Sequence, residues 1–397
     1  MRPPRIIWIV AAVAVLAAGA SYWLRTDGVD DGGAAGSTAG QARPAHRSDN
    51  RSDNRSGTLA GDGPRSPGGT EPPATTAGRA FDCSIEDFAD SRDETLSDEE
   101  QLAREQAKFY ALIDRLAEST DLDHRLMAGI LKINGDFPDA IDEFERLLPA
   151  MPEHPILHWR LLDACAVRPT HPLCADGEAE RRTISILGAN GEAWAKIAPY
   201  RLRRGDERGA LEALGNAATA AEFEDYWSAE TALLFGSLAS GPNSGITDRL
   251  LEAIGYTAAF PMPQLSLIQQ CRSRAGSSPD WYRVCLAYGQ RKETDTQTLL
   301  GKGIGVGLQR ALYELIGDTQ NAQAAEARAG PVEYSLRDPQ LRDGEVLLAY
   351  DESIALAWLQ HMVVYGQLSA QDFLKAEVDR VRRIPGYDPC PEPVPQM

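Results

Sequence analysis

The chain has 397 residues, with 40 Lys and Arg side chains against 58 Asp and Glu, which gives a formal net charge of −18 and a hydrophobic fraction of 43%. This charge argues against a nucleic-acid partner, because phosphate binding needs a surplus of cations on at least one face and no dense Lys/Arg run occurs. The length and the apolar content are sufficient for a large core, so we expect several units or one long repeat array.

An uncharged, apolar run of nineteen residues, 6–24, follows Arg2 and Arg5. As a helix this run would be about 28 Å long, close to the hydrocarbon thickness of a bilayer. The basic residues on its short leading side predict a single transmembrane anchor over 1–25 with the N-terminus inside the cell. The small residues around Ala20 also fit a signal-peptide cleavage site, so a secreted protein is the alternative. Both interpretations export the remaining chain, into the periplasm if the host is a Gram-negative bacterium.

Residues 26–80 have the composition of a disordered linker. They hold eleven Gly and five Pro but no Phe, Trp, Tyr, Ile or Met. Such a segment has too little apolar surface to offset the entropy lost on ordering. We therefore expect a flexible tether between the anchor and a folded domain that covers 81–397.

All six cysteines follow the linker, and an even number of cysteines in an exported domain favours disulfides. Cys271 and Cys285 stand at equal distances from a turn between two helical patterns, and Cys165 and Cys174 flank a short loop. This leaves Cys83 and Cys390 to join the two ends of the folded domain. No pair has the CxxC spacing of a zinc or redox site, so these are candidates for structural disulfides.

From residue 81 onward, apolar residues recur every three or four positions, which predicts helices. Ser97 and Glu100 form a capping box that should open a helix ending near Glu118. In the second half of the chain, helices are expected at 247–256, 263–275, 280–291, 296–316, 346–366 and 369–384. The Gly330-Pro331 and Asp338-Pro339 pairs predict a longer irregular connection between the helices expected at 296–316 and 346–366.

A period of 35 residues relates His124, Trp159 and Trp194, each of which opens a similar segment, and the same offset relates Ala140, Ala175 and Ala210. Helix, turn and helix at a fixed period near 34 are typical of a stacked array. On these residues the sequence over 121–223 resembles the tetratricopeptide repeat family. The best unit presents that family's large, small and turn positions as Trp194, Ile197, Ala198, Gly205, Ala210, Leu214 and Ala217, although Arg201 stands where the family usually has Tyr.

The resemblance implies an all-α domain of stacked antiparallel helix hairpins, an α-solenoid, with its clearest repeats over 121–223 and a diverged helical part over 224–397. Small residues let the two helices of a hairpin approach each other, and large ones fill the gap to the next hairpin. Stacked hairpins of this kind form extended binding grooves.

Motifs for catalysis or cofactor binding were sought and not found. The glycines at 301, 303, 305 and 307 fit neither a phosphate-binding loop nor a dinucleotide fingerprint, and favour close helix packing or a loop. His154 and His158 have a spacing that could present two metal ligands, but Pro155 lies between them and no HExxH acid is nearby. The sequence therefore predicts no cofactor, no metal site and no catalytic residue.

These features together favour a membrane-tethered, extracytoplasmic scaffold or adaptor that binds a protein or peptide of the cell envelope. Arg201 and Arg204, on the first helix of the best repeat, are the candidate partner-binding residues. One alternative is an envelope enzyme, for example one acting on cell-wall polymer through carboxylates of a cleft. Another is a structural component of an envelope assembly. Nothing in the sequence indicates the identity of the partner or the oligomeric state.

Overall fold

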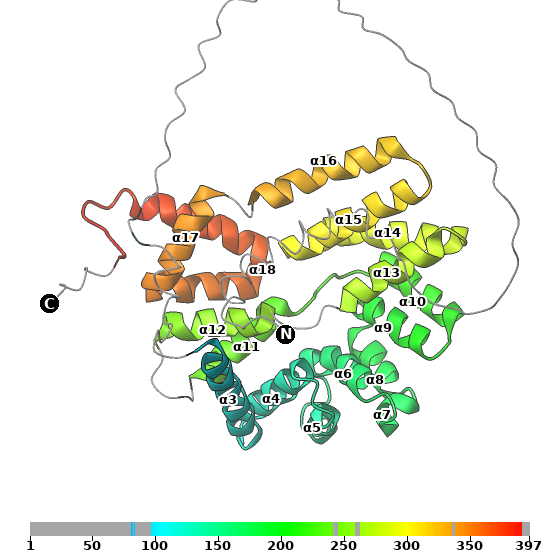
Figure 1. The fold of residues 1–397 in the computed structure, drawn as a ribbon, viewed down its shortest axis with the longest axis horizontal. Helices are drawn as coiled ribbons and strands as arrows, with labels where there is room; N and C mark the ends of the chain where they lie inside the picture. The colour runs from blue at the N-terminus through cyan, green and yellow to red at the C-terminus, as the bar shows by residue number, and fades with distance from the viewer. Residues whose placement is uncertain are drawn as a thin grey trace, which may run out of the picture. The chain divides into compact units, whose positions relative to one another are not determined.

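The computed structural model describes residues 81, 83, 97–239, 241, 245–258, 263–335 and 338–390. The predicted anchor at 6–24 and the predicted linker at 26–80 lie outside these residues. The described part forms sixteen α-helices, α3 to α18, and contains no strand apart from an isolated bridge between Asn190 and Glu222 (Figure 1). The prediction of an all-α fold is thus confirmed. None of the helices in this part combines the length and hydropathy needed to cross a bilayer.

The first half of the described chain is a series of helices joined by short loops. These are α3 (Asp98–Ala117), α4 (Leu122–Asn134), α5 (Ala140–Leu147), α6 (Pro155–Val167), α7 (Pro172–Ala175), α8 (Glu178–Leu187), α9 (Gly191–Arg203) and α10 (Glu207–Thr219). Helix α4 packs on α5, α6 on α8, and α9 on α10. Three helix pairs therefore occupy the segment in which the sequence shows its period.

The second half contains longer helices. These are α11 (Trp227–Leu238), α12 (Ile246–Ala258), α13 (Pro263–Ala275), α14 (Pro279–Asp295), α15 (Leu299–Leu315), α16 (Thr319–Ser335), α17 (Pro339–Tyr350) and α18 (Glu352–Val381). Helix α14 packs on α15, α15 on α16, and α17 on α18.

The local signals for helix ends act as the sequence predicts. The Ser97 backbone amide donates to the Glu100 carboxylate at 2.9 Å, and the Glu100 amide donates to the Ser97 hydroxyl at 3.3 Å, so the capping box is formed. Helix α3 ends at Ala117, one residue before the expected end. Pro155 and Pro279 each occupy a first-turn position, where a missing amide hydrogen costs no intrahelical bond.

The expected irregular connection near Gly330 is wrong, because α16 runs through the Gly330-Pro331 pair. Its buried face consists of alanines, among them Ala325 and Ala329, which pack beside Val306 of α15. The two last predicted helices are also divided differently: α17 ends at Tyr350, and α18 continues to Val381 with a non-helical break at Gly366.

The glycines at 301–307 lie in α15, and Gly305 among them permits close packing against α14. A Cβ atom built on Gly305 would stand 2.5 Å from the backbone nitrogen of Glu293 and 2.7 Å from the carbonyl oxygen of Gly289. Only glycine fits at such a crossing. The structure thus assigns this cluster of glycines to helix packing. This is one of the two interpretations that remained once the nucleotide-binding motifs failed to match.

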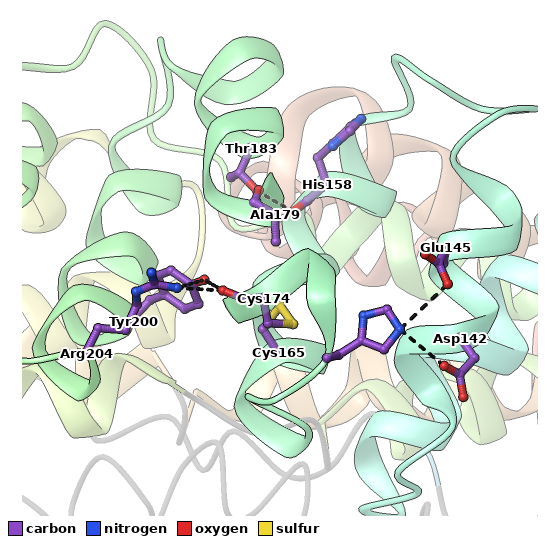
Figure 2. The surroundings of a disulfide bond; sticks show 10 residues. Asp142, Glu145, His158, Cys165, Cys174, Ala179, Thr183, Tyr200 and Arg204 are labelled. Carbon is purple, nitrogen blue, oxygen red and sulfur yellow. Dashed lines mark hydrogen bonds and ion pairs between the residues drawn. A yellow bond between two sulfur atoms is a disulfide. The ribbon is translucent and has the colours of Figure 1, made fainter. Parts of the chain in front are cut away.

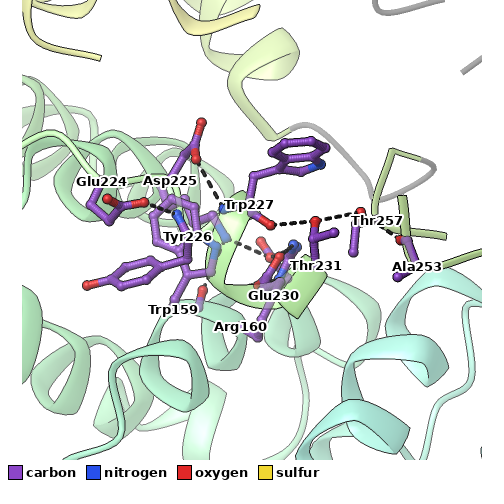
Figure 3. Close-up of polar contacts among 12 residues, drawn as sticks. Trp159, Arg160, Glu224, Asp225, Tyr226, Trp227, Glu230, Thr231, Ala253 and Thr257 are labelled. Atoms are coloured by element: carbon purple, nitrogen blue, oxygen red, sulfur yellow. Dashed lines mark hydrogen bonds and ion pairs between the residues drawn. The ribbon is translucent and has the colours of Figure 1, made fainter. Parts of the chain in front are cut away.

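Buried ion pairs connect helices that are far apart in the sequence. Arg160 of α6 donates from Nε to Glu230 of α11 at 2.5 Å, and from NH1 to Asp163 at 3.0 Å. Lys196 of α9 donates to the same Asp163 at 2.7 Å and lies over the ring of Trp159. Figure 3 shows Arg160 and Glu230 directed toward each other beside Trp159. These bonds position α6, α9 and α11 relative to one another inside the core.

Candidate functional site

The six cysteines form three disulfides, in the pairs that the loop spacing favours. Cys165 is joined to Cys174, Cys271 to Cys285, and Cys83 to Cys390, with Cα–Cα distances of 5.4, 5.8 and 5.6 Å. Disulfides of this kind form and persist in oxidising compartments and are rare in the cytosol. The folded part of the chain is therefore built for an oxidising environment.

A solvent-open polar pocket of about 440 Å³ lies where α7 and α8 meet α9 and α10. Its lining alternates in charge and consists of Asp176, Gly177, Glu180, Arg181, Arg201, Arg204 and Asp206. Both arginines that the sequence offered as partner-binding candidates line this pocket. No other feature of the described residues brings Arg201 and Arg204 together with charged groups of another helix pair.

Two glycines with left-handed backbone conformations shape the walls of the pocket. Gly177, at φ +72°, turns the chain from α7 into α8, and Gly205, at φ +77°, turns it from α9 into α10. Asp206 then caps α10 by accepting the amide hydrogen of Gly209 at 2.8 Å. The sequence reading placed Gly205 at a turn between paired helices, which is its position in the structure.

Arg201 ties three helices together at the base of the pocket. Its Nε donates to the Glu180 carboxylate of α8 at 2.6 Å, and its NH1 donates to the carbonyl oxygen of Gly209 in α10 at 2.8 Å. The side chains of Arg201 and Glu180 are only 19% and 16% exposed. Because its guanidinium is hydrogen-bonded to both neighbouring helices, Arg201 mainly holds α8, α9 and α10 together. Its charge also contributes to the lining of the pocket.

Arg204 is an exposed cation of the pocket. Its NH1 donates to the carbonyl oxygen of Cys174 at 2.6 Å and to the Tyr200 hydroxyl at 3.2 Å. Figure 2 shows Tyr200 and Arg204 both directed at Cys174, next to its disulfide. Within the described part of the chain, both hydrogen bonds of Arg204 come from NH1, so Nε and NH2 can still bind a planar acceptor such as a carboxylate.

Buried carboxylates also occur, but they are sealed inside the core. Burial raises the pKa of the Glu230 carboxyl, although Arg160 beside it acts in the opposite direction. Burial lowers the pKa of Lys196 to about 8, against the opposing effect of Asp163. These side chains are at most 10% exposed, and none of them lines the pocket. Their arrangement thus resembles a structural ion-pair network more than a cleft that could admit a substrate.

A second cluster of charged side chains joins α9 to α14. Lys292 donates to Glu192, and Asp225 accepts from the hydroxyl of Thr298 at 3.0 Å. Burial raises the pKa of the Asp225 carboxyl, and the nearby Lys292 lowers it. Glu192 and Lys292 are each about 1% exposed. Two acids and a lysine are thus close together, but Glu192 and Lys292 are buried and paired with each other, and only Asp225 is partly exposed.

The two histidines with possible metal-ligand spacing serve the start of α6. His154 is the residue before the helix, and His158 Nε2 lies 2.8 Å from the carbonyl oxygen of Pro152. Burial lowers the pKa of both imidazoles. The contact of His158 holds the loop that precedes α6, and neither histidine is hydrogen-bonded to a carboxylate within the described residues.

Sequence reasoning found the two arginines but missed their acidic neighbours. Asp176 directly follows α7 and Glu180 lies in α8, and no periodic signal in the sequence marked either residue. Their proximity to Arg201 depends on how one helix pair packs on the next. Comparison with known proteins supplies no further guide, since the chain matches no family model, no curated protein and no solved structure.

Proposed function

We propose that this protein is an extracytoplasmic scaffold or adaptor that binds a protein or peptide through the polar pocket between α8 and α9. The supporting observation is that Arg204, exposed and with two nitrogens unused, stands in an open pocket with carboxylates on the facing wall. A pocket with both signs of charge suits a peptide, whose backbone and termini offer both signs, better than a purely anionic ligand.

The proposal includes a repeat architecture for the helical domain. The pairs α4 with α5, α6 with α8, and α9 with α10 begin at residues 122, 155 and 191, close to the 35-residue period of the sequence. This spacing supports a tetratricopeptide-like stack over 121–223, with the pocket at the junction of two units. The diverged helices from 224 onward would extend the same array.

The proposal also places the folded domain outside the cytoplasm, tethered by a helix at 6–24. The three disulfides support export. A reporter fused after residue 80 should be active only outside the cytoplasm, and activity in the cytoplasm would contradict this part of the proposal. Detection of the residue 6–24 segment in the mature protein by mass spectrometry would distinguish a retained anchor from a cleaved signal peptide.

The binding function is tested by site-specific photo-crosslinking in intact cells. A photoreactive residue replaces Arg181, whose side chain is 64% exposed at the rim of the pocket, and in a matched strain it replaces Arg283, which is 75% exposed on α14 away from the pocket. We expect a defined crosslinked partner from position 181 only. Equal capture from both positions would contradict a specific site.

Charge reversal then tests the role of Arg204. Arg204→Glu should abolish the crosslink from position 181, because it removes the cation that can hold a carboxylate. Arg208→Glu is the control, since Arg208 carries the same charge on the next helix and is 90% exposed outside the pocket lining. An equal loss in both variants would mean that net charge, and not this pocket, determines binding.

A further inference from the structure

Three side chains that commonly bind metals converge beside the Cys165–Cys174 disulfide. Asp142 and Glu145 belong to α5, and His171 is the residue before α7. One oxygen or nitrogen atom from each of the three lies within 4.8 Å of those of the other two. Figure 2 shows the Asp142 and Glu145 side chains close to this disulfide, on the side opposite Tyr200 and Arg204.

The local structure holds these groups in place. Asp142 and Glu145 are three positions apart on a helix, so their side chains lie on one face. His171 sits in the loop that the Cys165–Cys174 disulfide closes, and its carbonyl oxygen accepts the amide hydrogens of Cys174 at 2.9 Å and Ala175 at 2.8 Å. The histidine backbone is thus fixed by a covalent bond and two hydrogen bonds before any ligand arrives.

The distances within the cluster differ from those of hydrogen bonds. His171 Nε2 lies 3.4 Å from Asp142 Oδ1 and 3.6 Å from Glu145 Oε2. A charge-assisted N–H···O bond would be about 2.7–2.9 Å long. Two ligands that share a tetrahedral ion at the usual Zn–N and Zn–O distances stand about 3.3–3.6 Å apart. The two separations from His171 Nε2 fall within this range.

Burial and charge also suit a cation. His171 is buried, with a side chain only 6% exposed, whereas Asp142 and Glu145 are 41% and 54% exposed and can adjust toward an ion. Arg168 NH1 donates to both oxygens of Asp142, at 3.1 and 3.0 Å. Hydrogen bonding of this kind orients a carboxylate that binds a metal. With a neutral imidazole, the two carboxylates and one guanidinium still carry a net negative charge.

We propose that Asp142, Glu145 and His171 bind one divalent transition-metal ion of the Zn²⁺ type, with water at the remaining position. One imidazole with two carboxylates suits Zn²⁺ better than Ca²⁺ or Mg²⁺, which favour all-oxygen ligand sets. The ion would fasten α5 to the disulfide-closed loop. This site is separate from the peptide pocket, and the inference does not depend on the proposed binding function.

The test uses the full-length protein without a polyhistidine tag, titrated with ZnCl₂ in competition with a chromophoric chelator. We expect one site per chain, unaffected by excess CaCl₂ or MgCl₂. His171→Ala should lower the Zn²⁺ affinity about 100-fold, which is the upper end of the loss seen when residues that only support metal ligands are replaced. The double variant Asp142→Asn with Glu145→Gln should lower it to a similar extent. His124→Ala and Glu153→Gln, which alter a histidine and a carboxylate outside the cluster, should retain the wild-type affinity.

X-ray absorption of the Zn²⁺-loaded wild-type protein provides a readout that does not depend on variants. One imidazole nitrogen together with oxygen ligands at about 2.0–2.2 Å is the expected first shell. A shell with two or more imidazoles, or a wild-type affinity equal to that of His171→Ala, would overturn the proposal. In that case the cluster would be an ion pair between a protonated histidine and two carboxylates.

Discussion

Arg204 NH1 donates a hydrogen bond of 2.6 Å to the carbonyl oxygen of Cys174, so a disulfide-bonded residue anchors an arginine that lines the polar pocket. The Tyr200 hydroxyl donates to the same oxygen at 2.5 Å. Since Cys174 of α7 is held by Cys165 of α6, the orientation of this arginine depends on a covalent bond between the two preceding helices α6 and α7. The pocket and the oxidation state of the chain are thus physically connected.

This connection predicts that two disulfides of similar loop length differ in their effect on binding. Replacing both Cys165 and Cys174 by Ser should cost about 2–3 kcal/mol of unfolding free energy and should also weaken the crosslink at position 181. Replacing both Cys271 and Cys285 should cost a similar free energy and leave the crosslink intact. Urea unfolding and crosslinking yield check the two effects, and equal crosslinking in both variants would refute the connection.

The helices of this fold were largely predictable because their signals are local. Capping residues, first-turn prolines and the spacing of apolar residues all act within one or two turns, and the capping box at Ser97 shows this at atomic detail. The loop spacing of Cys165 and Cys174 is local in the same sense. Helix α16 escaped prediction because a Gly-Pro pair usually interrupts a helix, whereas the alanine face that retains this one is recognisable only with α15 beside it.

Lys196 should produce a pH-dependent contribution to stability. Burial lowers its pKa to about 8 in the folded state, while the unfolded chain has the ordinary value near 10.5. Between these values the unfolded state binds more protons, so the free energy of unfolding should rise with pH. From pH 8 to pH 9.5 the unfolding free energy of the wild type should rise by about 1.5–2 kcal/mol relative to that of Lys196→Met. Taking the difference between the two proteins removes the contribution of the other titrating groups.

Urea unfolding of both proteins at several pH values in this range measures the difference. A difference that is flat with pH would mean that Lys196 keeps its ordinary pKa, because Asp163 then offsets its burial in full. A difference that falls with pH would contradict the sign of the shift.

The ion pair between Arg160 and Glu230 should be costly to break on one side and cheaper to remove whole. Glu230→Gln leaves the Arg160 guanidinium, which is buried in α6, without its main counter-charge, and should cost about 3–5 kcal/mol. A double replacement by Met and Leu should cost less than that single change, because no charge remains buried. A thermodynamic double-mutant cycle checks this order, and additive effects would show that the two groups do not interact.

The candidate site could be predicted only in part, for a reason that this ion pair illustrates. Arg160 and Glu230 are 70 positions apart, and nothing in their local sequence marks them as partners. The same applies to Arg201 and Glu180, and to His171 with its two carboxylates, which share no recognisable motif. The sequence placed Arg204 on the first helix of a pair, and in the structure it is the C-cap residue that directly follows α9. The residues that face Arg204 depend on how neighbouring helix pairs pack, and a single sequence does not reveal that packing directly.

The break in α18 provides the last test, since it rests on a single glycine. Gly366 has φ +84°, and a Cβ atom there would stand 2.6 Å from the Cβ of Gln297, while the amide of Leu368 donates to the carbonyl oxygen of Gln297 at 3.1 Å. Gly366→Ala should therefore introduce backbone strain and also a steric clash with Gln297. Gln297 cannot easily move away, because it accepts the hydrogen bond from Leu368. Gly317→Ala is the matched control, because Gly317 has φ +75° but nothing within 4 Å of the added carbon.

Backbone strain alone should cost about 1 kcal/mol at either position, and the clash should raise the cost at Gly366 to about 3 kcal/mol. Chemical denaturation of the two variants measures both values. If they are equally destabilised, steric contact with Gln297 contributes nothing, and the break in α18 is determined by the backbone conformation of Gly366 alone.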